Sequence, residues 1–263
     1  MAFCTDPSVT YLNKFGYNVV RLPRKGISPM DVLGRRDSVE RLGRLSAVWK
    51  TTAPEPQLSV PQPVADVEGR RSQDLELSIG LKVLENALRG LGAAVPSVDF
   101  AFQQARKVQF TYTNITSVSV APLDAGNYLA SGDLNVANPV VSQYFLDDDA
   151  HAFLIVDVLR SDSICVTAKA ASGIAVDVDV PAIQGVVGAE VGVKHGGANS
   201  STIIFQGPEP ITFGFKAFVI AFVDGHWTLK GTKASGDMAF AVPGEDGDDG
   251  EPVMFSTSGT VRL

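Results

Sequence analysis

Apolar and polar residues alternate along much of the chain after Pro96, which is the pattern of half-buried β-strands. The alternation begins at Val98, Phe100 and Phe102 and resumes at Val108, Phe110 and Tyr112. Further strand-like segments follow at 152–160, 163–171, 174–180, 187–195, 202–206 and 213–223, and another starts at Trp227. Tight turns such as Ser172-Gly173 and Asp224-Gly225 join them, so we expect neighbouring strands to pair antiparallel.

Helical periodicity is confined to a few places. Spacings of four and three predict one face of an amphipathic helix that ends at Gly90 and Gly92; its apolar positions are Leu77, Leu81, Leu84, Leu88 and Leu91. A short helical turn is expected to end at Gly16, and a short helix or loop is expected at 139–148. Four prolines in 54–63 predict a surface loop or an irregular sheet edge. The fold class is therefore α+β, a twisted, mainly antiparallel central sheet with a few packed helices.

The window 75–83 satisfies both periods, so the same residues can form a helix face or a strand face. A strand that crosses a membrane needs about 9 to 11 residues with apolar side chains at every second position. Residues 75–84 with 98–112 fit one such hairpin, and 164–180 with 187–206 fit another. The lipid-facing candidates are Leu75, Leu77, Ile79, Leu81, Val98, Phe100, Val176, Val178, Val180, Val187, Val191 and Val193. The same pattern also fits a half-buried sheet with one wet face. In a bilayer every backbone group must be paired, so inserted hairpins would have to close into a ring of subunits.

Composition indicates one large globular domain, because the 263 residues are 45% hydrophobic with modest charge. The net charge of -7 is uneven, since the first fifty residues carry nine basic and four acidic side chains. That stretch is either a solvated surface or a face that meets anionic lipid headgroups. The chain shows no long apolar run for a membrane helix and no secretory signal, so we expect a protein made soluble in the cytoplasm. The acidic balance of the chain disfavours nucleic-acid binding.

No enzyme motif is present in the sequence. It contains no Gly-x-Ser-x-Gly, no phosphate-binding glycine loop, no dinucleotide fingerprint and no His-Glu-x-x-His, and its three histidines are widely separated. Two cysteines do not form a disulfide framework, and Cys165 lies in an apolar run that is typical of a buried small residue. Pairing of Cys165 with a histidine as a thiol hydrolase is the disfavoured alternative. We therefore expect a protein that is not an enzyme, with no metal and no cofactor.

Composition separates two short C-terminal segments from the body of the chain. Residues 243–252 hold five acids, three glycines and no base, and they miss the spacing of a calcium-binding loop. Such a segment is expected to be extended and mobile. The following residues to Leu263 are apolar and β-prone again, so they are expected to dock on the body. The predicted units are a body (1–242), an acidic linker (243–251) and a C-terminal peptide (252–263), which docks either as an inhibitor or as the final strand of the sheet.

The two ends of the chain carry a resemblance to a known family. Cys4 is too close to the terminus to build a core, and it is followed by a capped turn ending at Gly16 and by the start of a strand. This opening, most specifically residues 3–34, together with the overall length and the short tail, resembles the bacterial gasdermins. The resemblance implies a compact precursor of membrane pores whose near-terminal cysteine, here Cys4, carries a covalent S-palmitoyl group.

The resemblance also implies how such a precursor is switched. A partner protease removes the C-terminal peptide, and the released body assembles from a monomer into a large homo-oligomeric ring. Such rings form β-barrel pores in the cell inner membrane and kill the cell during antiviral (phage) defence. In this chain the cleavage-site candidates are Asp246, Asp248 and Asp249, which suit a caspase-like protease, although other partner proteases fit the same loop. The tail residues expected to pack over an oligomerisation edge are Met254, Phe255, Val261 and Leu263. A soluble lipid-binding, β-rich carrier is the alternative function.

Overall fold

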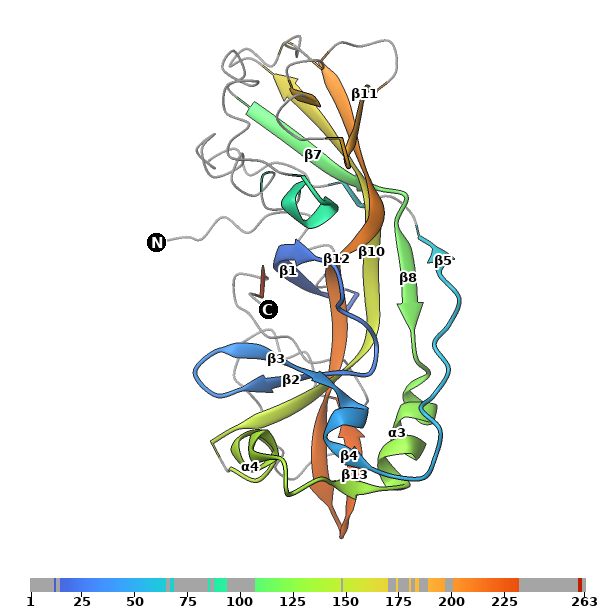
Figure 1. Ribbon diagram of the computed structural model, residues 1–263, viewed down its shortest axis with the longest axis vertical. Helices are drawn as coiled ribbons and strands as arrows, with labels where there is room; N and C mark the ends of the chain where they lie inside the picture. Colours follow the sequence, from blue (N-terminus) through green and yellow to red (C-terminus); the bar gives the residue numbers. More distant parts are fainter. Residues whose placement is uncertain are drawn as a thin grey trace.

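Two very long strands, β10 (His151–Lys169) and β12 (Thr202–Val223), pair antiparallel and run along the length of the molecule (Figure 1). The computed structural model describes residues 12, 15–64, 67–68, 85, 88–93, 107–147, 149–169, 174, 180, 183–184, 189–196, 201–231 and 260–261. Within them, the two long strands are the spine of a twelve-stranded sheet.

Shorter strands line the two outer sides of this spine. Along β10 they are β2 (Asp31–Arg35), β8 (Thr116–Ser119) and β7 (Lys107–Thr113), each antiparallel to it. Along β12 they are β13 (His226–Lys230), β1 (Asn18–Arg24) and β11 (Gly192–His195), again antiparallel. The margins are completed by β3 (Val39–Arg44) on β2, β5 (Gln62–Pro63) on β8, β6 (Val67–Glu68) on β7 and β14 (Thr260–Val261) on β1. The predicted α+β class with a mainly antiparallel sheet is confirmed.

Two helices and a 3₁₀ turn lie together at one end of the spine. Here α3 (Pro122–Ala130) and α4 (Pro139–Phe145) flank the small pair β4 (Trp49–Lys50) and β9 (Asp133–Leu134), and η1 (Leu45–Ala47) leads into β4 (Figure 1). Both α-helices begin with a proline, whose fixed φ suits the first helical position. The core beneath them contains an aromatic pair, in which the rings of Trp49 and Trp227 pack edge to face at 5.7 Å between centroids.

The structure corrects the number of strands that the sequence suggests. Segments 152–160 and 163–171 are one strand as far as Lys169, and segments 202–206 and 213–223 are also one strand. Ser163 faces Gln206 and Ser161 faces Ile211. Between these two pairs β12 therefore advances by five residues while β10 advances by two. This bulge holds Pro208 and Pro210, which lack the N–H group that a regular ladder requires.

Of the two glycines at which the sequence predicts the helix end, Gly92 is the one that ends it. Gly90 is still helical, and the turn ends at Gly92, whose φ is +112°. The amide of Gly92 donates to the carbonyl of Arg89, and that of Ala93 donates to the carbonyl of Leu88, which together form a Schellman cap. Gly90 has a different role, because a Cβ there would lie 2.5 Å from the carbonyl oxygen of Pro23.

Two predicted strands are shorter than expected or replaced. Val180 is helical, so the expected strand 174–180 is wrong at this residue. Among the described residues of the expected strand 187–195, Gly192–His195 form β11, whereas Ala189 and Glu190 form a turn and Val191 a bend. The sequence of this segment contains Gly188 and Gly192, and glycine lowers the tendency of a segment to form a strand.

Several predicted elements are confirmed. Gly16, at φ +76°, ends the first helical turn, and β1 follows two residues later. The helix alternative for 139–148 is borne out by α4, and 54–63 is an irregular segment that ends in the edge strand β5. Asp224 and Gly225, at φ +50° and +85°, make the two-residue hairpin turn between β12 and β13. No helix within the described ranges has the length and hydropathy needed to cross a membrane.

Candidate functional site at the edge of β1

The strand β14, near the C-terminus, lies parallel to β1, the first strand of the sequence (Figure 1). Thr260 faces Val19 and Val261 faces Val20, and this is the one parallel pair among the strands that the structure describes. A parallel ladder of two residues is short, and two-stranded contacts of this size are weak on their own. Removing β14 would leave the outer side of β1 as an open sheet edge, which can pair with another chain.

The inner side of β1 is attached to β12 only at its ends. Asn18 faces Phe215, Val19 faces Gly214, and the next aligned residue is Arg24, which faces Thr212. β1 therefore uses five positions where β12 uses two, and residues 20–23 are outside the regular ladder. Side chains must supply much of what holds this strand in place.

A polar cluster fixes the N-terminal end of β1. The Tyr17 hydroxyl donates a hydrogen bond to Oδ2 of Asp157 at 2.6 Å, and the Ser117 hydroxyl donates to Oδ1 of the same carboxylate at 2.7 Å. Nζ of Lys216 lies 4.3 Å from the centre of the Tyr17 ring, within the range of a cation–π contact. Burial raises the pKa of Tyr17, and the Asp157 hydrogen bond and charge raise it further, so the hydroxyl keeps the proton that it donates.

A second cluster fixes the loop that leaves β1. The carbonyl of Ile27 accepts hydrogen bonds from the Arg160 guanidinium at 2.8 Å and from the Thr212 hydroxyl at 3.2 Å. Asp31, which is 1% exposed, accepts from the amide of Ser28 at 3.0 Å and from Nε of Arg41 at 2.8 Å. Burial lowers the pKa of Arg160, an effect partly offset by the charge of Asp31. The spine strands β10 and β12 thus hold the start of the β1–β2 connection.

Acids from elsewhere in the chain partly neutralise the basic residues of the first fifty positions. The ion pairs are Lys25 with Glu209 at 3.5 Å, Arg36 with Asp147 at 3.3 Å, and Arg44 with Glu55 at 2.9 Å. Arg24 and Lys50 are exposed, and neither has an ion-pair partner in the described ranges. A lipid-facing role for this surface stays a prediction.

Most of the predicted site residues lie outside the described residues. These are Cys4, Asp246, Asp248, Asp249, Met254, Phe255, Leu263, Leu75, Leu77, Ile79, Leu81, Val98, Phe100, Val176, Val178 and Val187. Of the rest, Val261 is in β14, Val193 is in β11 opposite Phe205, and Val180 is helical. Val191 is fully buried, and the side-chain amide of Gln184 joins its carbonyl to the amide of Val193, both at 3.0 Å.

The sequence did not reveal the Tyr17–Ser117–Asp157 cluster, because its members are 40 to 140 residues apart. One signal was available. Asp157 is the one acid in the apolar run 152–159, and a charge at such a position usually has a partner. The identity of that partner depends on strand order, which the local pattern does not contain.

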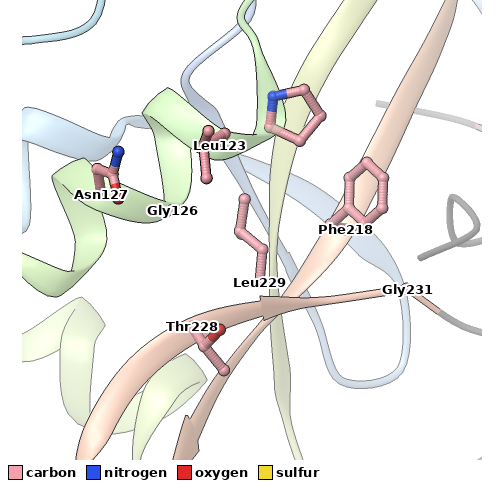
Figure 2. Close-up of a pocket in the computed structure, with 8 residues that line it drawn as sticks. Leu123, Gly126, Asn127, Phe218, Thr228, Leu229 and Gly231 are labelled. Atoms are coloured by element: carbon pink, nitrogen blue, oxygen red, sulfur yellow. The ribbon is translucent and has the colours of Figure 1, made fainter. Parts of the chain in front are cut away.

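An apolar groove of about 290 Å³ lies at the helical end of the sheet (Figure 2). Leu123, Gly126 and Asn127 of α3 face the side chains of Phe218, Thr228 and Leu229 across it. Over the part of the chain that is described, no three His, Cys, Asp or Glu side chains converge on one point as metal ligands would.

Comparison with known proteins identifies the family. The fold resembles a solved bacterial gasdermin from Bradyrhizobium tropiciagri with a TM-score of 0.62 at 18% identity, over 85% of this chain and 90% of that one. A gasdermin of Vitiosangium sp. is 37% identical over 231 residues, which are 87% of this chain and 86% of the relative. One of Lysobacter enzymogenes is 32% identical over 257 residues, 96% and 94% of the two chains.

The family model described as Bacterial Gasdermin Family matches residues 20–232. The chain therefore belongs to the bacterial gasdermin family, which is not a family of enzymes.

Proposed function

We propose that this chain is the precursor of a membrane pore, held inactive by the pairing of β14 with β1. Membership of the bacterial gasdermin family supports a pore-forming role. The observation that carries the switch is that the strand after the acidic linker covers the outer side of β1 at Val19 and Val20. A covered edge cannot pair with a second subunit, whereas an open one can.

Cleavage in the linker is the proposed trigger. Residues 243–251 precede β14 in the sequence, and among the described residues the ladder that would retain the cut peptide has two residue pairs. Because so short a contact holds a detached peptide weakly, the peptide dissociates and β1 becomes available. Asp246, Asp248 and Asp249 suit a caspase-like partner protease, and a protease of another specificity acting on the same linker would have the same effect.

The released bodies then form a large ring in lipid. The proposed membrane hairpins are built from residues 75–84 with 98–112 and from 164–180 with 187–206, and edge-to-edge closure satisfies their backbone groups. A palmitoyl group on Cys4 adds apolar anchoring, at about 0.8 kcal/mol for each methylene that is buried. The intact monomer is cytoplasmic, the pore is in the cell inner membrane, and the outcome is cell death in antiviral defence.

Dye release from liposomes tests this function. A specific protease site is placed in 243–251, and vesicles of bacterial polar lipids are mixed with the intact or the cut protein. The cut protein is expected to release the dye and the intact protein is not. A variant with a scrambled, uncuttable linker controls for the protease itself. Equal leakage before and after cutting would reject the switch.

A lipid carrier is the second candidate function, and the groove between α3 and β13 is the observation that favours it. A carrier has no need of a removable strand. Gel filtration of the cut protein in detergent separates the two functions, because a carrier stays monomeric whereas a pore precursor forms large assemblies.

A further inference from the structure

The position of β1 depends on contacts that the backbone ladder does not provide. Between Val19 and Arg24 its residues are out of register with β12, and this gap begins at the residues that pair with β14. Val20 is 2% exposed and packs on Phe215, which holds one face of the strand. Apolar packing is not directional. It therefore does not by itself fix the position of an edge strand along its axis, or its rotation about that axis.

The Tyr17–Ser117–Asp157 cluster supplies directional contacts at this point. Tyr17 is two residues before Val19, and its hydroxyl reaches across β12 to a carboxylate on β10. Asp157 is the first aligned residue after an irregularity in β10, where Ile155 faces Ala217 and Asp157 faces Lys216. A bulge of this kind changes the direction of the side chain that follows it.

Both oxygens of the Asp157 carboxylate are occupied. One accepts from Tyr17 and the other from Ser117 of β8, at distances typical of strong O–H···O⁻ bonds. Because the cluster joins residues next to β1 with β8 and β10, it ties the strand that carries β14 to the middle of the spine.

We propose that Tyr17, Ser117 and Asp157 are positioning residues that set how firmly β14 is held. They hold β1 in the register in which Val19 faces Thr260 and Val20 faces Val261. Loss of the Tyr17 or Ser117 hydrogen bond lets the start of β1 shift, and the two-residue ladder opens more often without any cut. This inference rests on the proposed function and extends it, because it assigns the resting strength of the switch to residues far from the linker.

Substitution of Tyr17 by Phe tests the proposal. Y17F removes the hydroxyl but keeps the ring under Lys216. The matched control is Y144F, which removes the hydroxyl that donates to Glu40 at 3.1 Å on the exposed β2–β3 hairpin. Hydrogen exchange of the uncut full-length protein is followed by mass spectrometry in the peptides that contain residues 19–20 and 260–261. A bond to a charged group is strong enough that its loss is expected to speed exchange of both peptides about tenfold in Y17F. In Y144F the change is expected to stay below about twofold.

Ser117→Ala is the second variant, and it is expected to speed exchange in the same two peptides. Equal exchange in Y17F, S117A and Y144F would overturn the proposal, as would a uniform increase over all peptides of the protein. Dye release by the same proteins after cutting keeps the two ideas separate. If the cut proteins release no dye, the pore function fails, while faster exchange of β14 in Y17F still supports the positioning role.

Discussion

At the scale of single residues, Tyr112 shows how the sheet buries a group that can ionise. Its ring stacks on Phe213 of β12 with 4.3 Å between centroids and 6° between planes. Burial raises the pKa of Tyr112 above the ordinary value, which is about 10 in an unfolded chain. The folded protein therefore keeps the phenolic proton at a pH where the unfolded chain has already released it.

This difference predicts a loss of stability at alkaline pH. The contribution of Tyr112 is fully present below about pH 10 and is lost as the pH rises above that value, because deprotonation favours the unfolded chain. Urea unfolding between pH 8 and pH 11 is expected to give a free energy of unfolding that falls above pH 10. The fall is expected to be less steep in Y112F, although Tyr17, whose pKa is also raised, still contributes. Identical slopes for Y112F and the wild type would show that Tyr112 ionises equally well in the fold.

At the scale of elements, residues 88–91 lie close to the bend of β12 at Gly207 and close to β1 at Gly90. A Cβ on Gly207 would lie 2.8 Å from the carbonyl oxygen of Leu91, and one on Gly90 would lie 2.5 Å from that of Pro23. Both neighbours are backbone atoms, which do not move aside as the end of a flexible side chain does. The helical turn therefore sits against the point where the spine bulges.

Gly207→Ala is expected to destabilise the protein by about 1 to 3 kcal/mol, the usual range for overpacking in a filled interior. The matched control is Gly126→Ala in α3, where no atom lies within 4 Å of the added Cβ. That change is expected to be neutral or to stabilise by up to about 1 kcal/mol, because alanine favours a helix interior. Thermal unfolding monitored by circular dichroism compares the two variants. A melting temperature for G207A equal to that of G126A would mean that the helical turn can move away without loss.

Element prediction from the sequence worked where local chemistry decides the structure. The Asp224-Gly225 turn, the cap at Gly16 and the proline-rich edge at 54–63 all follow from backbone preferences of one or two residues. It did not work where long-range pairing decides. Pro208 and Pro210 indicate a break, but β10 continues alongside them and the chain passes through as a bulge. Val180 lies in a stretch that alternates like a strand, yet the residue is helical. A short period-two window does not exclude a helix.

The candidate site was predictable only in part. A docking tail follows from the apolar segment after an acidic, glycine-rich linker, and its alternative as a final strand already described what β14 does. The side chains that position β1 come from β8, β10 and the turn before β1, so only the assembled sheet brings them together.

At the scale of the whole molecule, β1 and β14, which come from opposite ends of the sequence, pair at one edge of a sheet that runs along the protein (Figure 1). Every other strand pair in the described ranges joins parts of the matched family region or the segment just before it, whereas β14 lies beyond the region that the family model matches. In the described ranges β14 is thus a short addition at the edge of the sheet that the family region forms.

The most direct test of this account is a reversible covalent link between β14 and β1. Val19→Cys and Thr260→Cys place a thiol on each of two directly paired residues, in a protein that also carries Cys165→Ala and a cuttable linker. Cys4 is kept throughout, so each variant with only one of the two introduced cysteines serves as a control for any disulfide that Cys4 forms. After cutting, the oxidised double variant is expected to leave dye-filled vesicles sealed and to release the dye once a reductant is added, while both controls leak with or without reductant. Leakage by the oxidised, cut double variant at the rate of the controls would show that pairing of β14 with β1 does not restrain the protein.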